Sequence, residues 1–404
     1  MEDYSMINFN KHVAIGIIGA GTMGTGIAQV AATFGHRVVI FDQQKEQLNR
    51  SHENLTNVIN RLVNKQKIDQ RDGENILSRV TFTNSINDLA SMGLIIEAIV
   101  EDLEVKKELF ANLEDLVNEN CFLATNTSSL SITSIAAACR IPQRVIGLHF
   151  FNPPPLMPLV EIVPGILTGS SVKEVLFNLM KEWGKVPVVA KDTPGFIVNK
   201  VARSFYGEAL RIYEEGIADI PRIDYAMKRI GKFRMGPFEL MDLIGNDVNY
   251  KVTETVFREF YYDQRYKPSI TQKRYVEAGL YGRKSGKGFY DYTELQNAQL
   301  DELEPDSKLD SMIFERIIVM LINEAADTLM YNIASKEDID LAMLNGVNYP
   351  KGLFKWADEL GLDFVASRLS DLYEMYHEDR YRTSPIIAKM AKTNEKFYPN
   401  AKDF

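Results

Sequence analysis

Residues 13–42 read VAIGIIGAGTMGTGIAQVAATFGHRVVIFD, and this stretch decides the fold. A short apolar run precedes three glycines at the spacing Gly19-x-Gly21-x-x-Gly24, and an amphipathic stretch follows them. A second apolar run then ends at Asp42. The order strand, glycine turn, helix, strand and acid is typical of a βαβ unit that binds a dinucleotide.

Each part of this motif has a physical reason. Gly19 permits the tight turn, Gly21 lets the backbone approach a pyrophosphate, and Gly24 allows close packing of helix on strand. The N–H groups and the dipole at the helix start favour the diphosphate. Asp42 would accept hydrogen bonds from the adenosine ribose and repel a 2′-phosphate, so we expect NAD rather than NADP.

A second informative stretch, residues 145–161, reads VIGLHFFNPPPLMPLVE. Two apolar runs flank a proline-rich turn, and both are expected to be strands. The first run carries His149 and the second carries Glu161. If the two strands lie side by side, an imidazole and a carboxylate meet at one end of the sheet. Such a pair can take a proton from a substrate and stabilise the imidazolium that results.

Two polar stretches of the same region have more than one interpretation. Residues 127–131, TSSLS, follow an apolar run and precede a helix, so their hydroxyls are N-caps or, for Ser128, a substrate contact at the sheet edge. Residues 44–78 are polar and helical in pattern and contain Lys45, Lys65 and Lys67. They form a solvated helical pair, or some of these lysines reach the phosphates of a large anionic substrate.

Composition bounds the class of protein. The chain has 404 residues, 45% hydrophobic, a net charge of −9 and a pI near 5.3, which disfavours general binding to nucleic acid or anionic membranes. The two cysteines have neither metal-ligand nor disulfide spacing, so we expect buried thiols and no metal site. No run approaches the roughly 18 apolar residues of a membrane span, and the first residues are acidic, so a cytoplasmic protein is expected.

The pattern changes from mixed to helical after Asp192-Thr-Pro-Gly195, and the helical part repeats itself at an offset of 116 residues. Matching pairs include Glu208 with Glu324, Asp224 with Asp340, Gly236 with Gly352, and Asp242 with Asp358. We predict an α/β Rossmann-type domain with a mainly parallel sheet, followed by an all-α region of two tandem helical domains. The predicted domains are residues 1–193, 194–295 and 296–404.

The motifs together are specific enough to indicate a family. They are residues 19–24 (GAGTMG), 97–101 (EAIVE) with Lys106, 126–131 (NTSSLS), 149–153 (HFFNP), 159–161 (LVE) and 192–199 (DTPGFIVN). With these motifs the chain resembles the L-3-hydroxyacyl-CoA dehydrogenases, and among them bacterial 3-hydroxybutyryl-CoA dehydrogenases with a second C-terminal helical domain.

The resemblance implies a role for each matching residue. His149 would be the general base of alcohol oxidation and the general acid of the reverse reaction, with Glu161 orienting it. Ser128 and Asn199 would hold the substrate oxygens. The residues expected to bind or order the NAD site are Gly19, Gly21, Thr22, Met23, Gly24, Asp42, Glu101, Lys106, Asn126, Ser128 and Asn152.

The implied reaction is oxidation of a short-chain (3S)-3-hydroxyacyl-CoA, foremost 3-hydroxybutyryl-CoA, to the 3-oxoacyl-CoA with NAD. Alternatives are a related substrate, such as 3-hydroxyadipyl-CoA or a free sugar acid, and a non-catalytic structural homologue. Single-copy members of the family resemble dimers that pair through the helical domain. The chain is therefore expected to be a homodimer, or a monomer in which the two helical copies form a pseudo-dimer.

Overall fold

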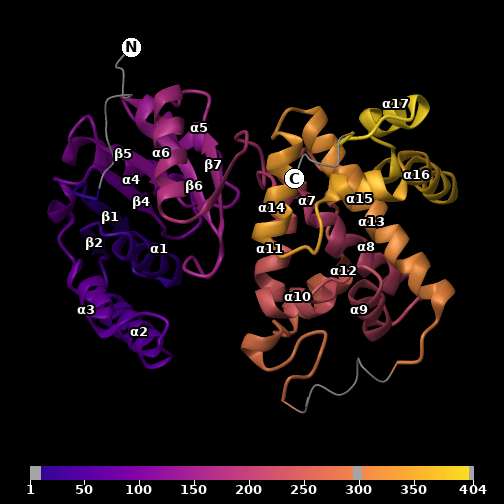
Figure 1. Cartoon of the computed structure of the whole chain (residues 1–404), viewed down its shortest axis with the longest axis horizontal. Coiled ribbons are helices and arrows are strands. Elements are labelled where there is room, and N and C mark those ends of the chain that lie inside the picture. The colour runs from indigo at the N-terminus through magenta and orange to yellow at the C-terminus, as the bar shows by residue number, and fades with distance from the viewer. Residues whose placement is uncertain (1–10, 294–302, 400–404) are drawn as a thin grey trace. The chain divides into compact units, whose positions relative to one another are not determined.

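The computed structural model describes residues 11–293 and 303–399. The chain divides into two compact units, Met1–Thr193 and Pro194–Phe404. Figure 1 shows strands and helices in the first unit and only helices in the second. The predicted fold class is confirmed in both parts.

The first unit is built on an eight-stranded sheet in the order β3-β2-β1-β4-β5-β6-β7-β8. Neighbouring strands from β3 to β6 pair in parallel, β7 runs antiparallel to β6, and β8 is parallel to β7. The bounds are β1 Ile15–Ile18, β2 Val38–Phe41, β3 Val80–Thr83, β4 Leu94–Glu97, β5 Phe122–Thr125, β6 Val145–Phe150, β7 Leu159–Pro164 and β8 Val186–Val189.

Helices cover both faces of this sheet, which is why its strands are continuous apolar runs rather than alternating ones. One core joins the sheet to α1, α2, α3 and α6, and the other joins it to α4 and α5. The helices are α1 Thr22–Thr33, α2 Lys45–Asn64, α3 Gln70–Ser78, α4 Leu103–Leu116, α5 Ile132–Ala136 and α6 Ser170–Glu182, with 3₁₀ turns η2 Ile86–Leu89 and η3 Pro142–Arg144.

The strand order places the site. From β1 the chain passes to β2 on one side and later to β4 on the other, so the order reverses beside β1. In open α/β sheets ligands bind outside the carboxyl ends of the strands at such a switch point. The carboxyl ends of β1, β2, β4, β5 and β6 share this edge because these strands are parallel.

The second unit contains two similar series of helices. The first series is α7 Val198–Val201, α8 Arg203–Glu214, α9 Ile220–Arg229, α10 Pro237–Ile244, α11 Asn246–Glu259, η4 Gln264–Tyr266, α12 Ile270–Glu277 and η5 Arg283–Ser285. The second is α13 Ser307–Met330, α14 Lys336–Gly346, α15 Leu353–Leu360, α16 Leu362–Tyr376, η6 Asp379–Tyr381 and α17 Pro385–Thr393. The second copy has one long helix, α13, where the first has α7 and α8. The predicted boundary at 295/296 lies outside the described residues and stays a prediction.

The same local device recurs in both copies. The buried Asp224 accepts hydrogen bonds from the N–H groups of Phe238 (2.9 Å) and Glu239 (2.9 Å) at the start of α10. Its counterpart Asp340 accepts one from Phe354 (3.0 Å) at the start of α15. In each case a carboxylate stabilises the N-terminus of the following helix. The two copies thus share the same hydrogen bonds as well as similar sequences.

The two copies contact each other through reciprocal ion pairs. Lys200 pairs with Glu324, which also accepts a hydrogen bond from the Tyr266 hydroxyl (2.6 Å). Arg316 pairs with Glu208 (3.1 Å), which accepts a hydrogen bond from the Tyr381 hydroxyl (3.0 Å). Lys200 and Arg316 are 116 residues apart, as are Glu208 and Glu324. This exchange of equivalent contacts is the arrangement of an isologous dimer interface, formed here within one chain.

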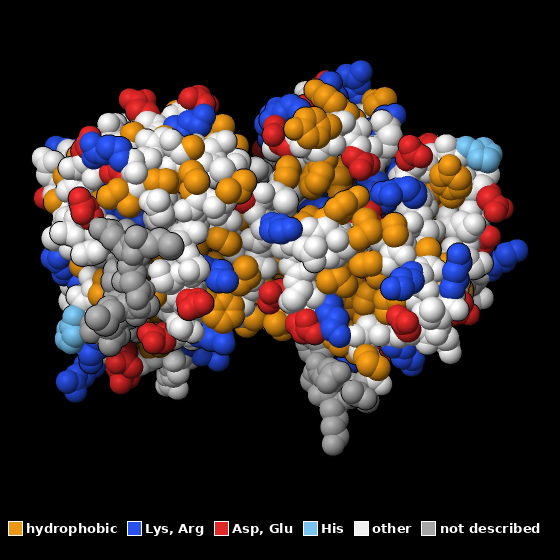
Figure 2. Space-filling view, turned by 90° about the horizontal axis from the view of Figure 1, so that it is seen from above, with side chains coloured by type: hydrophobic (Ala, Val, Ile, Leu, Met, Phe, Trp, Pro, Cys, Tyr) orange, Lys and Arg blue, Asp and Glu red, His pale blue; other side chains and the backbone are white. Residues whose placement is uncertain are grey.

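The surface and the helix lengths add two observations. Figure 2 shows acidic and basic side chains interspersed over the visible face of each unit. None of the helices within residues 11–293 and 303–399 is long and apolar enough to cross a membrane.

Candidate active site

The centre of the site is a cross-strand pair. His149 on β6 and Glu161 on β7 are directly opposite in the antiparallel register, so their side chains are on the same face. The His149 Nδ1 lies 2.6 Å from Glu161 Oε2, and Glu161 is completely buried. Since a carboxylate only accepts, the Nδ1–H donates to it, and the basic lone pair is on Nε2. The predicted meeting of imidazole and carboxylate is confirmed.

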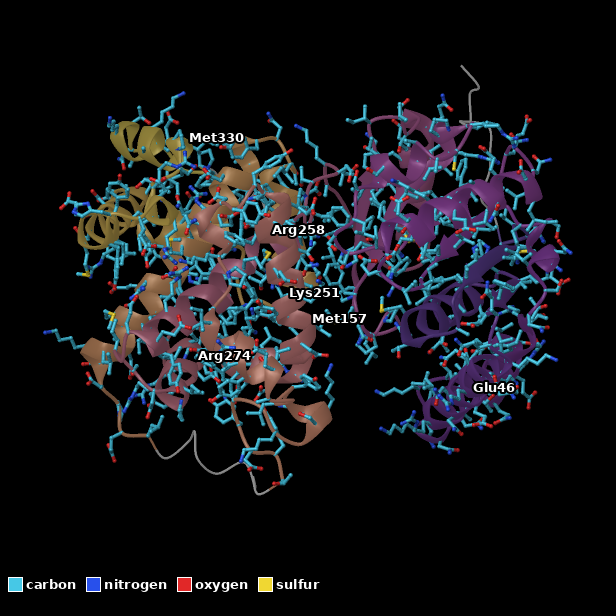
Figure 3. The ribbon with its side chains drawn as sticks, turned by 180° about the vertical axis from the view of Figure 1, so that it is seen from behind. Glu46, Met157, Lys251, Arg258, Arg274 and Met330 are labelled. Atoms are coloured by element: carbon cyan, nitrogen blue, oxygen red, sulfur yellow. The ribbon has the colours of Figure 1, made fainter. Side chains whose placement is uncertain are left out.

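The turn between these two strands is fixed by a residue that the sequence did not single out. Lys185, buried just before β8, donates from Nζ to the carbonyl oxygens of Pro154 (2.5 Å) and Met157 (2.9 Å). Burial lowers the pKa of Lys185 to about 8. Met157 is labelled in the turn in Figure 3. Lys185 thus ties the proline-rich turn to the strand on the far side of β7.

The glycine turn has the backbone that its sequence requires. Gly19 has φ +101°, and a Cβ there would lie 2.5 Å from the Ala98 carbonyl oxygen. A Cβ on Gly24 would lie 1.8 Å from the Gly19 carbonyl oxygen, so only glycine allows α1 to approach the turn this closely. Asp42, at the end of β2, accepts hydrogen bonds from the N–H of Ala20 (2.9 Å) and of Gln44 (2.9 Å).

These residues fit a dinucleotide. A Cβ on Gly21 would meet no atom within 4 Å, so the space beside this backbone is open. Gly21 is the N-cap of α1, and no side chain caps the helix start, where Thr22 is exposed and Met23 half-buried. The first N–H groups of α1 are thus available to a diphosphate. Each Asp42 oxygen keeps a further lone pair for a ribose hydroxyl.

Hydroxyl and charged groups form a second cluster at the ends of β4 and β5. Glu101 Oε1 accepts hydrogen bonds from the Thr127 hydroxyl (2.5 Å) and the Ser128 N–H (3.0 Å). Lys106 is buried, and its Nζ lies 2.5 Å from Glu97 Oε1 and 3.4 Å from Glu101 Oε2. The structure therefore joins three of the predicted residues, Glu101, Lys106 and Ser128.

Glu97 begins the 97–101 motif, but the sequence assigned no role to it. It is completely buried and also accepts hydrogen bonds from the Thr125 hydroxyl (2.7 Å) and the Ile99 N–H (2.8 Å). A signal was present, because a lone acid ends the apolar run of β4 at the carboxyl edge of the sheet. Glu97 and Glu101 thus both pair with the Lys106 ammonium.

The remaining predicted residues occupy different places. Asn126 Oδ1 accepts a hydrogen bond from the Phe150 N–H (2.8 Å), which links the ends of β5 and β6. Asn152 is exposed in the turn, before a cis peptide bond to Pro153. Asn199 lies on α7 of the second unit and is half-buried. Their predicted roles stay predictions.

The lysines of the α2–α3 hairpin are exposed. Lys45, Lys65 and Lys67 all have exposed side chains, and Lys67 lines a hollow of about 530 Å³ between the two helices. Both interpretations of these lysines, a solvated surface and a phosphate contact, stay open.

The cysteines lie apart from the site chemistry. Cys121 and Cys139 are buried free thiols, as predicted, and burial raises the pKa of Cys121 to about 12 and that of Cys139 to about 11. Such thiols are poor nucleophiles near neutral pH. No group of three or more His, Cys, Asp or Glu side chains in the described parts of the chain is arranged to hold a metal ion.

Comparison with known proteins gives a consistent result. The 3-hydroxyacyl-CoA dehydrogenase NAD binding domain matches residues 14–193, and the C-terminal domain of the same family matches residues 195–292 and 312–404. The 3-hydroxyadipyl-CoA dehydrogenase of Escherichia coli K12 is 37% identical, over 93% of this chain and 97% of that protein. The 3-hydroxybutyryl-CoA dehydrogenase of Clostridioides difficile is 42% identical, over 69% of this chain and 99% of that protein.

A solved structure is similar over nearly the whole length. The crystal structure of 3-hydroxybutyryl-CoA dehydrogenase from Escherichia coli K12 substr. MG1655 superposes with a TM-score of 0.89 at 36% identity, covering 96% of this chain and 99% of that one. Because the NAD binding domain of the family matches the first unit and its C-terminal domain matches both helical copies, the chain belongs to the 3-hydroxyacyl-CoA dehydrogenase family and is an NAD-dependent oxidoreductase.

Proposed function

We propose that the chain oxidises a short-chain (3S)-3-hydroxyacyl-CoA to the 3-oxoacyl-CoA, and reduces it in the reverse direction, with His149 as the general base and acid. The observation that supports this most is the buried cross-strand hydrogen bond between His149 and Glu161. An imidazole held by a carboxylate on one nitrogen presents the other as a base of fixed direction.

Each residue has a separate role in the proposed oxidation. His149 Nε2 takes the proton of the substrate hydroxyl, and the Glu161 carboxylate stabilises the imidazolium that forms. Ser128 and Asn199 orient the substrate oxygens, and the turn that Glu101 anchors holds Ser128 in place. The glycine turn and Asp42 would hold NAD, which would supply the hydride acceptor for the substrate carbon. The same proton returns from His149 in the reduction.

Two acyl groups are candidates for the substrate. The C. difficile relative is named for 3-hydroxybutyryl-CoA and matches 69% of the chain, whereas the E. coli relative named for 3-hydroxyadipyl-CoA matches 93% of it, including the second helical copy. The two acyl groups differ in length and in a terminal carboxylate. Both relatives belong to the same family, so family membership does not decide between the two substrates. The preference depends on the residues that contact the end of the acyl group.

The test is an assay of NADH formation with both thioesters and with L-gulonate as a free acid. We expect turnover of a thioester and none of the free acid. His149→Gln should lower kcat by roughly 10²–10⁴-fold, while NADH still binds, as measured by fluorescence. Retained turnover in that variant would remove the base assignment. A lack of turnover in the wild-type chain with every thioester would favour the non-catalytic alternative.

A further inference from the structure

One buried basic residue of the helical unit differs from the others. Lys200, Arg316 and Arg380 are buried, and each forms an ion pair with a glutamate. Arg203, on the first turn of α8, is also buried, but no carboxylate among the described residues lies within ion-pair distance of its guanidinium. A buried charge without a counter-charge is costly, so this exception needs an explanation.

The guanidinium is held by neutral acceptors only. Its Nε donates to the Asn199 carbonyl oxygen (2.8 Å), and its Nη1 donates to the Asn249 carbonyl oxygen (3.2 Å) and the Thr253 hydroxyl (2.8 Å). The Tyr206 ring lies 5.0 Å from it. Burial lowers the pKa of Arg203, and these contacts leave its positive charge uncompensated.

One nitrogen of the group remains for a ligand. Nη2 donates to no acceptor in the described part of the chain, yet it is not sealed from solvent. Its two N–H groups are fixed in direction because the other nitrogens are already bonded. A carboxylate is the group that best matches such a preorganised guanidinium edge.

Arg203 lies close in the chain to Asn199, the residue expected to contact a substrate oxygen. Arg203 follows Asn199 by four residues, and Ala202 between α7 and α8 has helical torsion angles. The Cβ atoms of residues four apart on a helix lie about 5–6 Å apart, so the two side chains start from the same helix face. In 3-hydroxyadipyl-CoA the terminal carboxylate lies three carbons beyond the hydroxyl-bearing carbon, which is a comparable span.

We propose that Arg203 receives the terminal carboxylate of a dicarboxylic 3-hydroxyacyl-CoA, of which 3-hydroxyadipyl-CoA has the fitting length. This inference rests on the proposed function, in which Asn199 holds a substrate oxygen. A substrate that ends in a methyl group leaves Nη2 without an acceptor and the Arg203 charge uncompensated. The site therefore selects for the carboxylate as well as binding it.

The alternative is that Arg203 only ties α8 to α11. The contacts to Asn249 and Thr253 lie on the inner side of α11, whereas Lys251 and Arg258 are exposed on that helix (Figure 3). A purely structural tie would affect all substrates alike. A change in the preference between two substrates of equal length would therefore distinguish carboxylate binding from a structural link between α8 and α11.

The experiment compares 3-hydroxyadipyl-CoA with 3-hydroxyhexanoyl-CoA, which has the same chain length and ends in a methyl group. We expect the wild-type chain to prefer the dicarboxylic substrate in kcat/KM, and Arg203→Met to lower that preference by roughly 10–100-fold through KM. Arg203→Lys keeps a point charge but loses the planar fork, so an intermediate loss is expected. Arg274→Met removes an exposed arginine on α12 (Figure 3) and should leave the preference unchanged.

The outcomes are distinct. A wild-type preference for the methyl-terminated substrate, or equal losses for both substrates in Arg203→Met, would overturn the carboxylate site while leaving the dehydrogenase assignment intact. Failure of the wild-type chain to oxidise any 3-hydroxyacyl-CoA would instead overturn the proposed function. If Arg203→Met does not fold, the preference of Arg203→Lys decides, and an unchanged ratio there counts against the inference.

Discussion

The imidazole of His149 owes its direction to strand register. His149 and Glu161 lie opposite each other because β6 and β7 pair antiparallel across the proline-rich turn. A slip of one residue in that register would turn every side chain of one strand to the other face and separate the pair. The hydrogen bond between His149 and Glu161 therefore depends on the turn that sets this register.

We expect Asp42 to determine which dinucleotide the glycine turn accepts. Its carboxylate is fixed beside the turn by the N–H groups of Ala20 (2.9 Å) and Gln44 (2.9 Å). Asp42→Ala removes the acceptor for the ribose hydroxyls and the repulsion of a 2′-phosphate. We expect the kcat/KM preference for NAD over NADP to fall by at least roughly tenfold, measured with one acyl-CoA substrate. An unchanged preference would show that Asp42 does not contact the ribose.

Single residues also show how far the sequence could predict the site. The strand runs, the glycine spacing and the His149–Glu161 pair follow from local pattern, because the buried parallel strands are continuous apolar segments. The position of Glu97 at the end of β4 was also such a signal, although its contact with Thr125 spans 28 residues. Lys185 left none, since its partner Pro154 lies 31 residues away. Long-range partners of a buried charge leave no periodic signal in the chain.

At the scale of elements, the Lys185 side chain connects the turn between β6 and β7 to the start of β8. Lys185→Met leaves the carbonyl oxygens of Pro154 and Met157 without their donor, and each unsatisfied group costs about 1–3 kcal/mol. We expect a lower free energy of unfolding in urea and a reduced kcat, since this turn joins the strands of His149 and Glu161.

The matched control for this substitution is Lys181→Met. Lys181 is exposed on α6, where its ammonium lies 4.7 Å from the centre of the Phe177 ring. A change at such a surface position should alter stability by less than about 1 kcal/mol. Equal effects of the two substitutions would mean that the contacts of Lys185 do not stabilise the turn.

The capping aspartates predict a pH dependence of stability. Burial raises the pKa of Asp340 to about 6, against 3.8 for the free group, so the folded chain binds this proton more tightly than the unfolded chain. The stabilisation from protonation is fully present below pH 3.8 and is lost as the pH rises through 6. Asp340→Asn keeps a neutral group there and removes this slope.

Denaturation of both proteins across pH 4 to 7 measures the difference. As the pH rises, the wild-type chain should lose up to about 3 kcal/mol relative to Asp340→Asn, because one pKa unit corresponds to about 1.4 kcal/mol. Parallel stability curves would show that Asp340 titrates in the same range in the folded and unfolded chains. Since Asp340 lies in the second copy, NADH formation should change little at pH 7.

At the scale of the whole molecule, the duplication lets the two helical copies make contacts with each other that two subunits would otherwise make. The pairs Lys200–Glu324 and Arg316–Glu208 exchange equivalent residues between the copies, as two subunits do in an isologous dimer. The 116-residue offset made the repeat visible in the sequence. It did not show that the two copies pack on each other, because side-chain contacts between repeats are not encoded in spacing.

This packing predicts the oligomeric state. If the second copy occupies the surface through which single-copy relatives would pair, no equivalent surface remains for another chain. We expect light scattering of the purified protein to give a mass near 45.9 kDa, independent of concentration. Lys200→Met removes one of the two cationic partners of the buried Glu324, which keeps Arg265 at 3.5 Å. The substitution should cost about 1–3 kcal/mol of stability without producing a dimer. A mass of twice the chain, lost in that variant, would instead assign these contacts to a dimer between chains.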